Sequence, residues 1–150
     1  MAKLKGNLLY GQSGGPTSVI NASAYGVIQE AKKHKDLINE IIVMKHGIKG
    51  ALNEDLIFIN EQNDEDIELL KHTPGSAFGS VRFKLPDFRE DDTNYLRLLY
   101  IFRKHNIRYF LYNGGNDSMD TCSKIADYMK QVDYECYIIG VPKTIDNDLP

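Results

Sequence analysis

The sequence predicts an α/β fold with three layers, in which a mostly parallel sheet carries helices on both faces. Short apolar runs alternate with segments whose apolar residues recur at helical spacing, and three of the runs end in loops rich in glycine and polar residues. Such alternation is typical of parallel sheets, because each crossover between parallel strands places a helix on the sheet. A chain of 150 residues is long enough to bury one core.

The first half of the chain predicts two strands, at 8–10 and 41–44, with a helix between them over 20–31. A short apolar run at 56–59 predicts a third element that need not belong to the main sheet. Asn63, with an acidic residue three positions later, predicts the N-cap of a short helix that extends to residue 70, and a glycine and serine loop follows it.

The second half repeats the alternation. A helix is expected over 93–105, followed by a buried strand at 107–112 that is rich in aromatic and β-branched residues. The segment 113–118 predicts a glycine turn leading into another helix, and 136–141 a further buried strand. The chain ends at Pro150 without a helix to cover that strand, so we expect a piece of a larger protein.

Composition excludes several classes of protein. With 18 Lys and Arg against 21 Asp and Glu, the net charge of −3 argues against nucleic acid or an anionic membrane as the main partner. No apolar run approaches 18 residues and no signal peptide is evident, so we expect a cytoplasmic location. Cys122 and Cys136 lack a CxxC partner and the histidines lack metal-ligand spacing, so we expect packed thiols and no zinc site.

Three loops follow directly after predicted strands, at 11–18, 113–118 and 142–148. In a parallel sheet all three would lie at the carboxyl edge, where ligands bind in α/β proteins. The glycines of the first loop, followed by a helix, suit either phosphate binding or a plain strand-to-helix turn. This loop has neither GxGxxG nor GxxxxGK[ST] spacing, which argues against a dinucleotide fingerprint and a Walker motif.

The second and third loops carry candidate chemistry. Asp117 is either the N-cap of the helix that follows or a carboxylate directed at a ligand. Asp146 and Asp148 lie two residues apart and follow Lys143 and Thr144. This set provides a possible general base, a metal partner, a phosphate-binding cation and a hydroxyl donor within six residues.

Four segments carry a resemblance to a known family: SGGPTSVINA at 13–22, GSAFGSVR at 75–82, GGNDS at 114–118 and PKTIDND at 142–148. In their order and spacing the chain resembles the phosphofructokinases, and in particular their pyrophosphate-dependent branch. The resemblance implies a large two-lobed enzyme that transfers a phosphoryl group to the 1-hydroxyl of fructose 6-phosphate. Residues 1–150 would form an incomplete donor-phosphate lobe, with the sugar-phosphate lobe beyond residue 150.

The resemblance also implies roles for individual residues. Asp146 resembles the base that accepts the sugar hydroxyl proton, Asp148 its acidic neighbour, and Thr144 a hydrogen-bond donor to the moving phosphoryl group. The donor phosphates would be held by residues of the first two segments and the glycine turn: Gly14, Gly15, Arg82, Asp117 and Ser118. Mg²⁺ is the implied cofactor, near Asn116 and Asp117, and the full-length chain is expected to form a homo-oligomer.

Two positions bear on the choice of phosphoryl donor. Members that use ATP usually carry glycine where this chain has Asp117 and Lys143, and members that use pyrophosphate resemble this chain at both. A carboxylate about 4 Å from an α-phosphate charge would cost roughly 4 kcal/mol at an effective dielectric constant of about 20, or about a thousandfold in affinity. Lys143 would stabilise charge near the transferred phosphoryl group.

One departure keeps other functions open. The family's usual metal-associated acid is Asn116 in this chain, which removes a negative charge from the expected Mg²⁺ neighbourhood. The alternatives are therefore an ATP-dependent 6-phosphofructokinase and a non-catalytic regulatory or phosphate-binding chain of the same fold.

Overall fold

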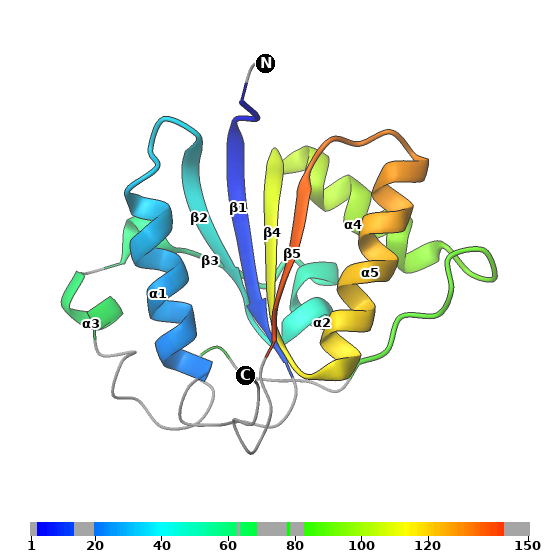
Figure 1. Ribbon diagram of the computed structural model, residues 1–150, viewed down its shortest axis with the longest axis horizontal. Coiled ribbons are helices and arrows are strands. Elements are labelled where there is room, and N and C mark those ends of the chain that lie inside the picture. The colour runs from blue at the N-terminus through cyan, green and yellow to red at the C-terminus, as the bar shows by residue number, and fades with distance from the viewer. Residues whose placement is uncertain (1–2, 14–19, 63, 69–77, 79–82, 143–150) are drawn as a thin grey trace.

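The computed structural model describes residues 3–13, 20–62, 64–68, 78 and 83–142 (Figure 1). Its elements are, in order, β1 (Gly6–Gln12), α1 (Ile20–Lys32), β2 (Ile38–Met44), α2 (Gly47–Leu52), β3 (Leu56–Phe58), the 3-10 turn η1 (Ile59–Glu61), α3 (Asp64–Glu68), α4 (Thr93–Lys104), β4 (Ile107–Gly114), α5 (Asn116–Gln131) and β5 (Tyr137–Pro142).

The strands form one sheet in the order β3-β2-β1-β4-β5. All neighbours are parallel except β3, which runs antiparallel to β2 with Phe58 opposite Ile42. The mostly parallel α/β sheet predicted from the sequence is therefore confirmed. The short element at 56–59 does belong to the main sheet. Residues 56–58, which follow α2, pair with the edge of β2 that faces away from β1.

Helices cover both faces of the sheet, as predicted. In Figure 1, α1 lies on one side of the strands and α2, α4 and α5 lie on the other. The alternation of side chains along β1 shows why: Leu8 and Tyr10 pack with α1, whereas Leu9 packs with the helices on the opposite face. Each face thus has its own buried apolar core, and the sheet is the middle layer of three.

The helix α4 shows how local chemistry sets an element's ends. The carboxylate of Asp91 accepts hydrogen bonds from the backbone N–H of Thr93 at 3.0 Å and from its hydroxyl at 2.7 Å, which satisfies polar groups at the first turn. The helix ends before Asn106, whose φ of 47° lies in the left-handed region. On the buried side, the ring of Phe102 lies 5.6 Å from that of Phe110, which anchors α4 to β4.

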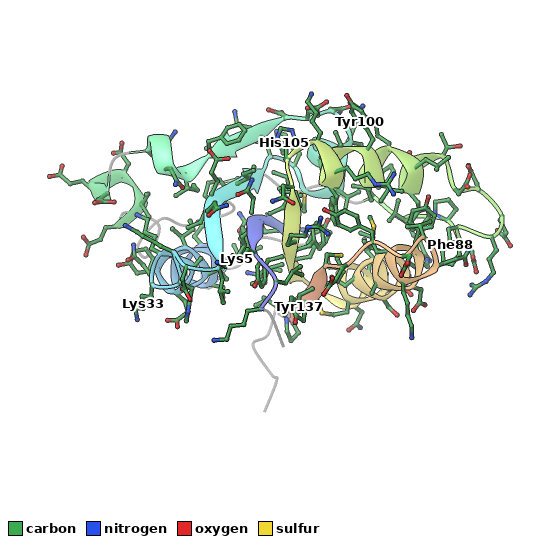
Figure 2. The ribbon with its side chains drawn as sticks, turned by 90° about the horizontal axis from the view of Figure 1, so that it is seen from above. Lys5, Lys33, Phe88, Tyr100, His105 and Tyr137 are labelled. Atoms are coloured by element: carbon green, nitrogen blue, oxygen red, sulfur yellow. The ribbon has the colours of Figure 1, made fainter. Side chains whose placement is uncertain are left out.

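The last strand, β5, differs from expectation. Its continuous apolar run predicts burial, but Tyr137 is 54% exposed and Ile139 is 47% exposed. The reason is position: β5 is the edge strand of the sheet as far as the structure describes it, and α1 on that face packs mainly on β1, β2 and β4. Figure 2 shows Tyr137 on the opposite side of the view from Tyr100 and His105.

Two further expectations are only partly tested. The short acidic helix is present as α3, but Asn63, its predicted N-cap, and residues 69–70 lie outside the described residues. Of the loop at 74–80, the structure describes only Phe78, whose backbone carbonyl accepts a hydrogen bond from the N–H of His46 at 2.9 Å.

Candidate active site

The carboxyl ends of three parallel strands are level with one another. Gln12 of β1 lies opposite Asn113 of β4, and Asn113 lies opposite Val141 of β5, while Gly114 lies opposite Pro142. The three glycine-rich and polar loops therefore begin side by side at one edge of the sheet. This confirms the shared edge predicted from the sequence.

The glycine turn between β4 and α5 is closely packed. A Cβ atom on Gly114 would lie 2.1 Å from Oγ of Ser118 and 3.0 Å from the backbone oxygen of Ser13. The absence of a side chain at Gly114 allows the first turn of α5 to approach the end of β1. The second loop thus brings two predicted ligand-binding segments together through a contact that only glycine permits.

The first turn of α5 holds the three predicted site residues that the structure describes: Asn116, Asp117 and Ser118. Gly115 is the N-cap residue and makes no side-chain capping hydrogen bond. The interpretation of Asp117 as the N-cap is therefore wrong, because β4 extends to Gly114 and the helix begins at Asn116, two residues earlier than that interpretation requires.

Asn116 and Asp117 are exposed, whereas Ser118 is only 4% exposed. Asp117 lies in the first turn of α5, where the backbone N–H groups of the helix favour negative charge. An exposed carboxylate and an exposed amide oxygen here are hard oxygen ligands of the kind Mg²⁺ prefers, so these residues fit the expected ion. Within the described residues, no three His, Cys, Asp or Glu side chains form a metal-binding group.

A tyrosine network on the α2 side joins β4 to the residue that follows β1. The hydroxyl of Tyr112 is hydrogen-bonded to the side chain of Ser13 and accepts a hydrogen bond from the backbone N–H of Ile48 at 3.4 Å. The backbone N–H of Ser13 donates to the carbonyl of Asn113 at 2.8 Å. Burial raises the pKa of Tyr112, and its hydrogen bonds to Ser13 and Ile48 oppose that effect. The hydroxyl therefore stays protonated at neutral pH.

A second tyrosine network lies on the α1 side of the same two strands. The side-chain amide of Asn113 donates to the hydroxyl of Tyr10 at 3.0 Å and to the carbonyl of Ile20 at 3.4 Å. Tyr10 in turn donates to Oε1 of Gln12 at 3.3 Å. Burial raises the pKa of Tyr10 far above its usual range, and the hydrogen bond from Asn113 only partly offsets this. Three strand residues and the first residue of α1 are thus linked by hydrogen bonds.

Sequence reasoning did not find these networks, because it treated the tyrosines as apolar strand residues. A signal was present. Both strands end with a tyrosine followed within two residues by an amide side chain, Tyr10 with Gln12 and Tyr112 with Asn113. This repeat at the ends of two neighbouring strands indicates paired polar groups at the shared edge.

Seven predicted site residues lie outside the described residues: Gly14, Gly15, Arg82, Lys143, Thr144, Asp146 and Asp148. Their roles remain predictions. For all of them except Arg82, the described strands show where the segment that carries the residue begins, since β1 ends at Gln12 and β5 at Pro142.

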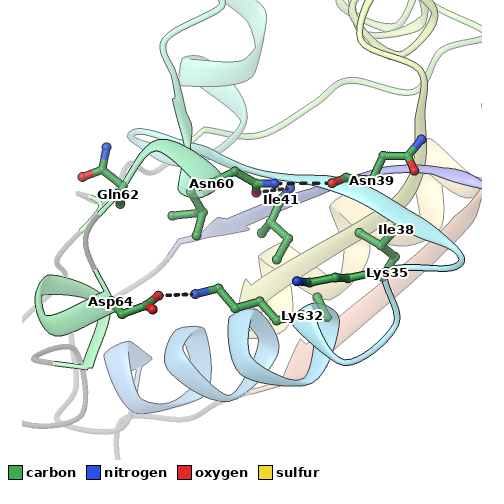
Figure 3. Close-up of a pocket in the computed structure, with 10 residues that line it drawn as sticks. Lys32, Lys35, Ile38, Asn39, Ile41, Asn60, Gln62 and Asp64 are labelled. Carbon is green, nitrogen blue, oxygen red and sulfur yellow. Dashed lines mark hydrogen bonds and ion pairs between the residues drawn. The ribbon is translucent and has the colours of Figure 1, made fainter.

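A separate hollow of about 570 Å³ lies at the opposite edge of the sheet, between the end of α1 and the start of β2 (Figure 3). Lys32 and Asp64 form an ion pair across it at 2.9 Å. The side chain of Asn60 bonds to the backbone of β2, accepting from Ile41 N–H and donating to the carbonyl of Asn39, both at 3.4 Å. The polar groups in these three contacts already have protein partners, and none belongs to the predicted site.

The two cysteines are free. Cys122 is buried, as expected, whereas Cys136 is only partly buried. Burial raises the pKa of Cys122 to about 12 and that of Cys136 to about 11. Both are protonated thiols at neutral pH and therefore poor nucleophiles.

Comparisons with known proteins identify the family of the chain. The family model for phosphofructokinases matches residues 7–150. The chain belongs to the phosphofructokinase family. The match begins in β1 and includes all three loops at the carboxyl edge.

Among curated relatives, a pyrophosphate--fructose 6-phosphate 1-phosphotransferase from Halomonas elongata is 52% identical over 144 residues, which are 96% of this chain and 34% of that protein. A protein of the same name from Methylococcus capsulatus is 48% identical over the same shares. An ATP-dependent 6-phosphofructokinase from a Sulfurihydrogenibium species is 30% identical over 91% of this chain and 38% of its own length. The chain thus spans about a third of the length of these relatives.

Solved structures give the same picture. A pyrophosphate-dependent phosphofructokinase from Marinobacter aquaeolei is 50% identical, with a TM-score of 0.87 over 97% of this chain and 35% of that one. A phosphofructokinase from Pichia pastoris, at 18% identity and a TM-score of 0.76, shares the fold. Within the part of the chain that is described, no helix has the length and apolar character needed to span a membrane.

Proposed function

We propose that the protein containing this chain transfers a phosphoryl group from pyrophosphate to the 1-hydroxyl of fructose 6-phosphate, forming fructose 1,6-bisphosphate in glycolysis. The observation that carries the proposal is the exposed carboxylate of Asp117 in the first turn of α5, at the shared carboxyl edge of a phosphofructokinase-family chain. Residues 1–150 supply the donor-phosphate side, and a segment beyond residue 150 supplies the sugar-phosphate side. We further propose a cytoplasmic homo-oligomer.

In this mechanism the chain's residues hold the donor and move one proton. Gly14, Gly15 and Arg82 bind the donor phosphates. Asp146 accepts the proton of the 1-hydroxyl while that oxygen forms a bond to the terminal phosphorus of pyrophosphate. The bond from this phosphorus to the bridging oxygen breaks, and inorganic phosphate leaves with the electron pair.

The remaining residues stabilise charge. Lys143 and Thr144 contact the phosphoryl group in transit, and Asp148 lies beside the base. Mg²⁺, when bound near Asn116 and Asp117, neutralises part of the donor's negative charge.

Asp117 explains the choice of donor. Pyrophosphate ends where the α-phosphate of ATP would continue toward this carboxylate, so the longer donor is repelled and the compact one is not. An ATP-dependent 6-phosphofructokinase is a second candidate, because the Sulfurihydrogenibium protein of that name is 30% identical to this chain. The exposed Asp117 argues against it in this protein.

The test is an assay of the full-length protein with both donors at matched Mg²⁺. We expect wild type to use pyrophosphate and to show little activity with ATP. Replacing Asp117 by Gly should lower kcat/KM for pyrophosphate and open measurable ATP activity, with a contrast of up to about a thousandfold between the donors before screening by water.

Asp127→Gly provides the matched control, because Asp127 is also exposed on α5 but lies well beyond its first turn. It should lose some stability without changing donor preference. A wild-type preference for ATP would contradict the proposed role of Asp117, and turnover with neither donor would support the non-catalytic alternative.

A further inference from the structure

Asn113 occupies the centre of the candidate site but is not among the residues that the sequence predicts. It lies on β4 between the ends of β1 and β5, and it is 1% exposed. Its side-chain nitrogen has two acceptors, the hydroxyl of Tyr10 and the carbonyl of Ile20. One buried side chain therefore contacts β1 and the first residue of α1 from the strand that leads into the glycine turn.

The oxygen of the same amide has no partner. Among the described residues, Oδ1 of Asn113 is the buried side-chain polar atom that lacks a hydrogen bond. A buried acceptor without a donor destabilises a folded protein, and this loss opposes the gain from the two hydrogen bonds made by the nitrogen. Net stability therefore does not account for an asparagine at this position.

The position of Asn113 between two elements does account for an asparagine here. Asn113 fixes the end of β1 through Tyr10 and the start of α1 through Ile20, and these are the two ends of the segment that contains Gly14 and Gly15. Asn113 also lies one residue before Gly114, where a Cβ atom would meet both Ser118 of α5 and the backbone of Ser13, the residue that follows β1. The side chain thus sets the position of the first loop's two ends relative to the turn that carries Asp117.

We propose that Asn113, acting with Tyr10, is a positioning residue for the phosphoryl donor: it holds the ends of β1 and α1 in register with the first turn of α5 and thereby sets the affinity for pyrophosphate. The inference rests on the proposed function and deepens it. Small displacements of groups that hold a substrate lower catalytic efficiency by large factors, so the effect should be visible in donor kinetics.

The experiment compares Asn113→Leu with wild type in the full-length protein. Leucine has a similar size, and it removes the unpaired oxygen together with the two hydrogen bonds. Tyr10 retains Gln12 as its acceptor. We expect the urea midpoint to stay unchanged or rise, while KM for pyrophosphate rises at least tenfold and kcat changes by less than threefold.

Two further variants separate positioning from a structural role. Tyr10→Phe should raise KM for pyrophosphate by a smaller factor, and the double variant should be no worse than Asn113→Leu alone, because both residues act through one network. Asn7→Leu is the matched control: Asn7 also bridges neighbouring strands, but at the opposite edge of the sheet. It should lower the urea midpoint and leave KM unchanged.

The outcomes are distinct. A KM within twofold of wild type in both Asn113→Leu and Tyr10→Phe overturns the positioning role, as does a loss of stability in Asn113→Leu with unchanged KM. If Asn113→Leu does not fold, Tyr10→Phe and its KM decide. A wild-type protein that neither binds nor turns over pyrophosphate, measured by calorimetry and by assay, contradicts the proposed function and this inference together.

Discussion

Two asparagines tie neighbouring strands together at opposite edges of the sheet, and they differ in how fully their amides are used. At the amino edge, Asn7 donates to the carbonyl of His105 at 2.6 Å and accepts from the backbone N–H of Glu40 at 3.0 Å. At the carboxyl edge, Asn113 uses its nitrogen twice and leaves its oxygen buried and unpaired. The satisfied amide serves stability, whereas the unsatisfied one marks the edge where the site is built.

Charged side chains also differ between the two edges of the sheet. At the amino end of β4, the carboxylate of Glu54 accepts hydrogen bonds from Lys104 at 2.8 Å and from Arg97 at 3.2 Å, and it lies 3.2 Å from Nε2 of His105. Glu54 holds this position at a φ of 54°. At the carboxyl edge, Asp117 is exposed and forms no ion pair with another residue that the structure describes. The carboxylate of Glu54 is thus paired with neighbouring cations, while that of Asp117 is exposed to solvent.

The largest expected effect tests whether the carboxyl edge carries the chemistry. Replacing Asp146 by Ala in the full-length protein should lower kcat by at least about 100-fold, the low end for loss of a positioned general base, with little change in KM for pyrophosphate. Steady-state kinetics with varied pyrophosphate measure both constants. The urea midpoint should match that of wild type. A kcat within threefold of wild type would assign the base to another residue.

An intermediate effect tests whether the amino edge carries stability. Asn7→Leu removes a donor to His105 and an acceptor for Glu40, and it should cost about 1–2 kcal/mol of unfolding free energy. Urea denaturation measures this loss, and donor kinetics under native conditions should be unchanged. The division between the edges fails if Asn7→Leu changes KM for pyrophosphate as much as Asn113→Leu does.

The smallest effect concerns Glu54. Hydrogen bonds from Lys104 and then His105 lower the pKa of Glu54 from 4.5. Because its folded-state pKa is depressed, its contribution to stability is present above the ordinary carboxyl pKa and is lost as pH falls through the folded-state value. Glu54→Gln should therefore lower stability near neutral pH by less than about 1 kcal/mol, as is usual for partly exposed ion pairs.

The pH dependence provides the check on that prediction. The difference in urea midpoint between wild type and Glu54→Gln should shrink as pH is lowered below 4.5. Lys33→Gln is a suitable control, because the pair of Lys33 with Glu30 is exposed and local to α1. A difference that does not shrink on acidification would show that the charge of Glu54 is not the source of its contribution.

Most of the fold could be predicted from hydrophobic spacing. The alternation of strand and helix established the parallel sheet and its two covered faces. The spacing could not show that residues 56–58 join the sheet, because a three-residue strand has too few positions to indicate a pairing partner. It also overestimated the burial of β5, since an apolar run shows that a strand can be buried but not which neighbours are present.

Part of the candidate site could likewise be predicted from the sequence and part could not. Glycines and carboxylates after the predicted strands indicated the shared edge, because a few consecutive residues are enough to recognise each of those loops in the sequence. The roles of Tyr10 and Asn113 could not be predicted from the sequence, since the hydrogen-bond partner of a buried hydroxyl depends on the register between β1 and β4. Likewise, Asp117 looked like an N-cap because the sequence does not show that the first helical residue is Asn116.

The two tyrosine networks allow the candidate site to be followed by near-ultraviolet spectroscopy. The sequence has no tryptophan and nine tyrosines, so tyrosine dominates the near-ultraviolet absorption and emission of the chain. Tyr10 and Tyr112 are almost fully buried at the ends of β1 and β4, with hydroxyls that contact Asn113 and Ser13 of the first two loops. Near-ultraviolet circular dichroism, compared between wild type and Tyr10→Phe, would therefore report on this edge without an added label.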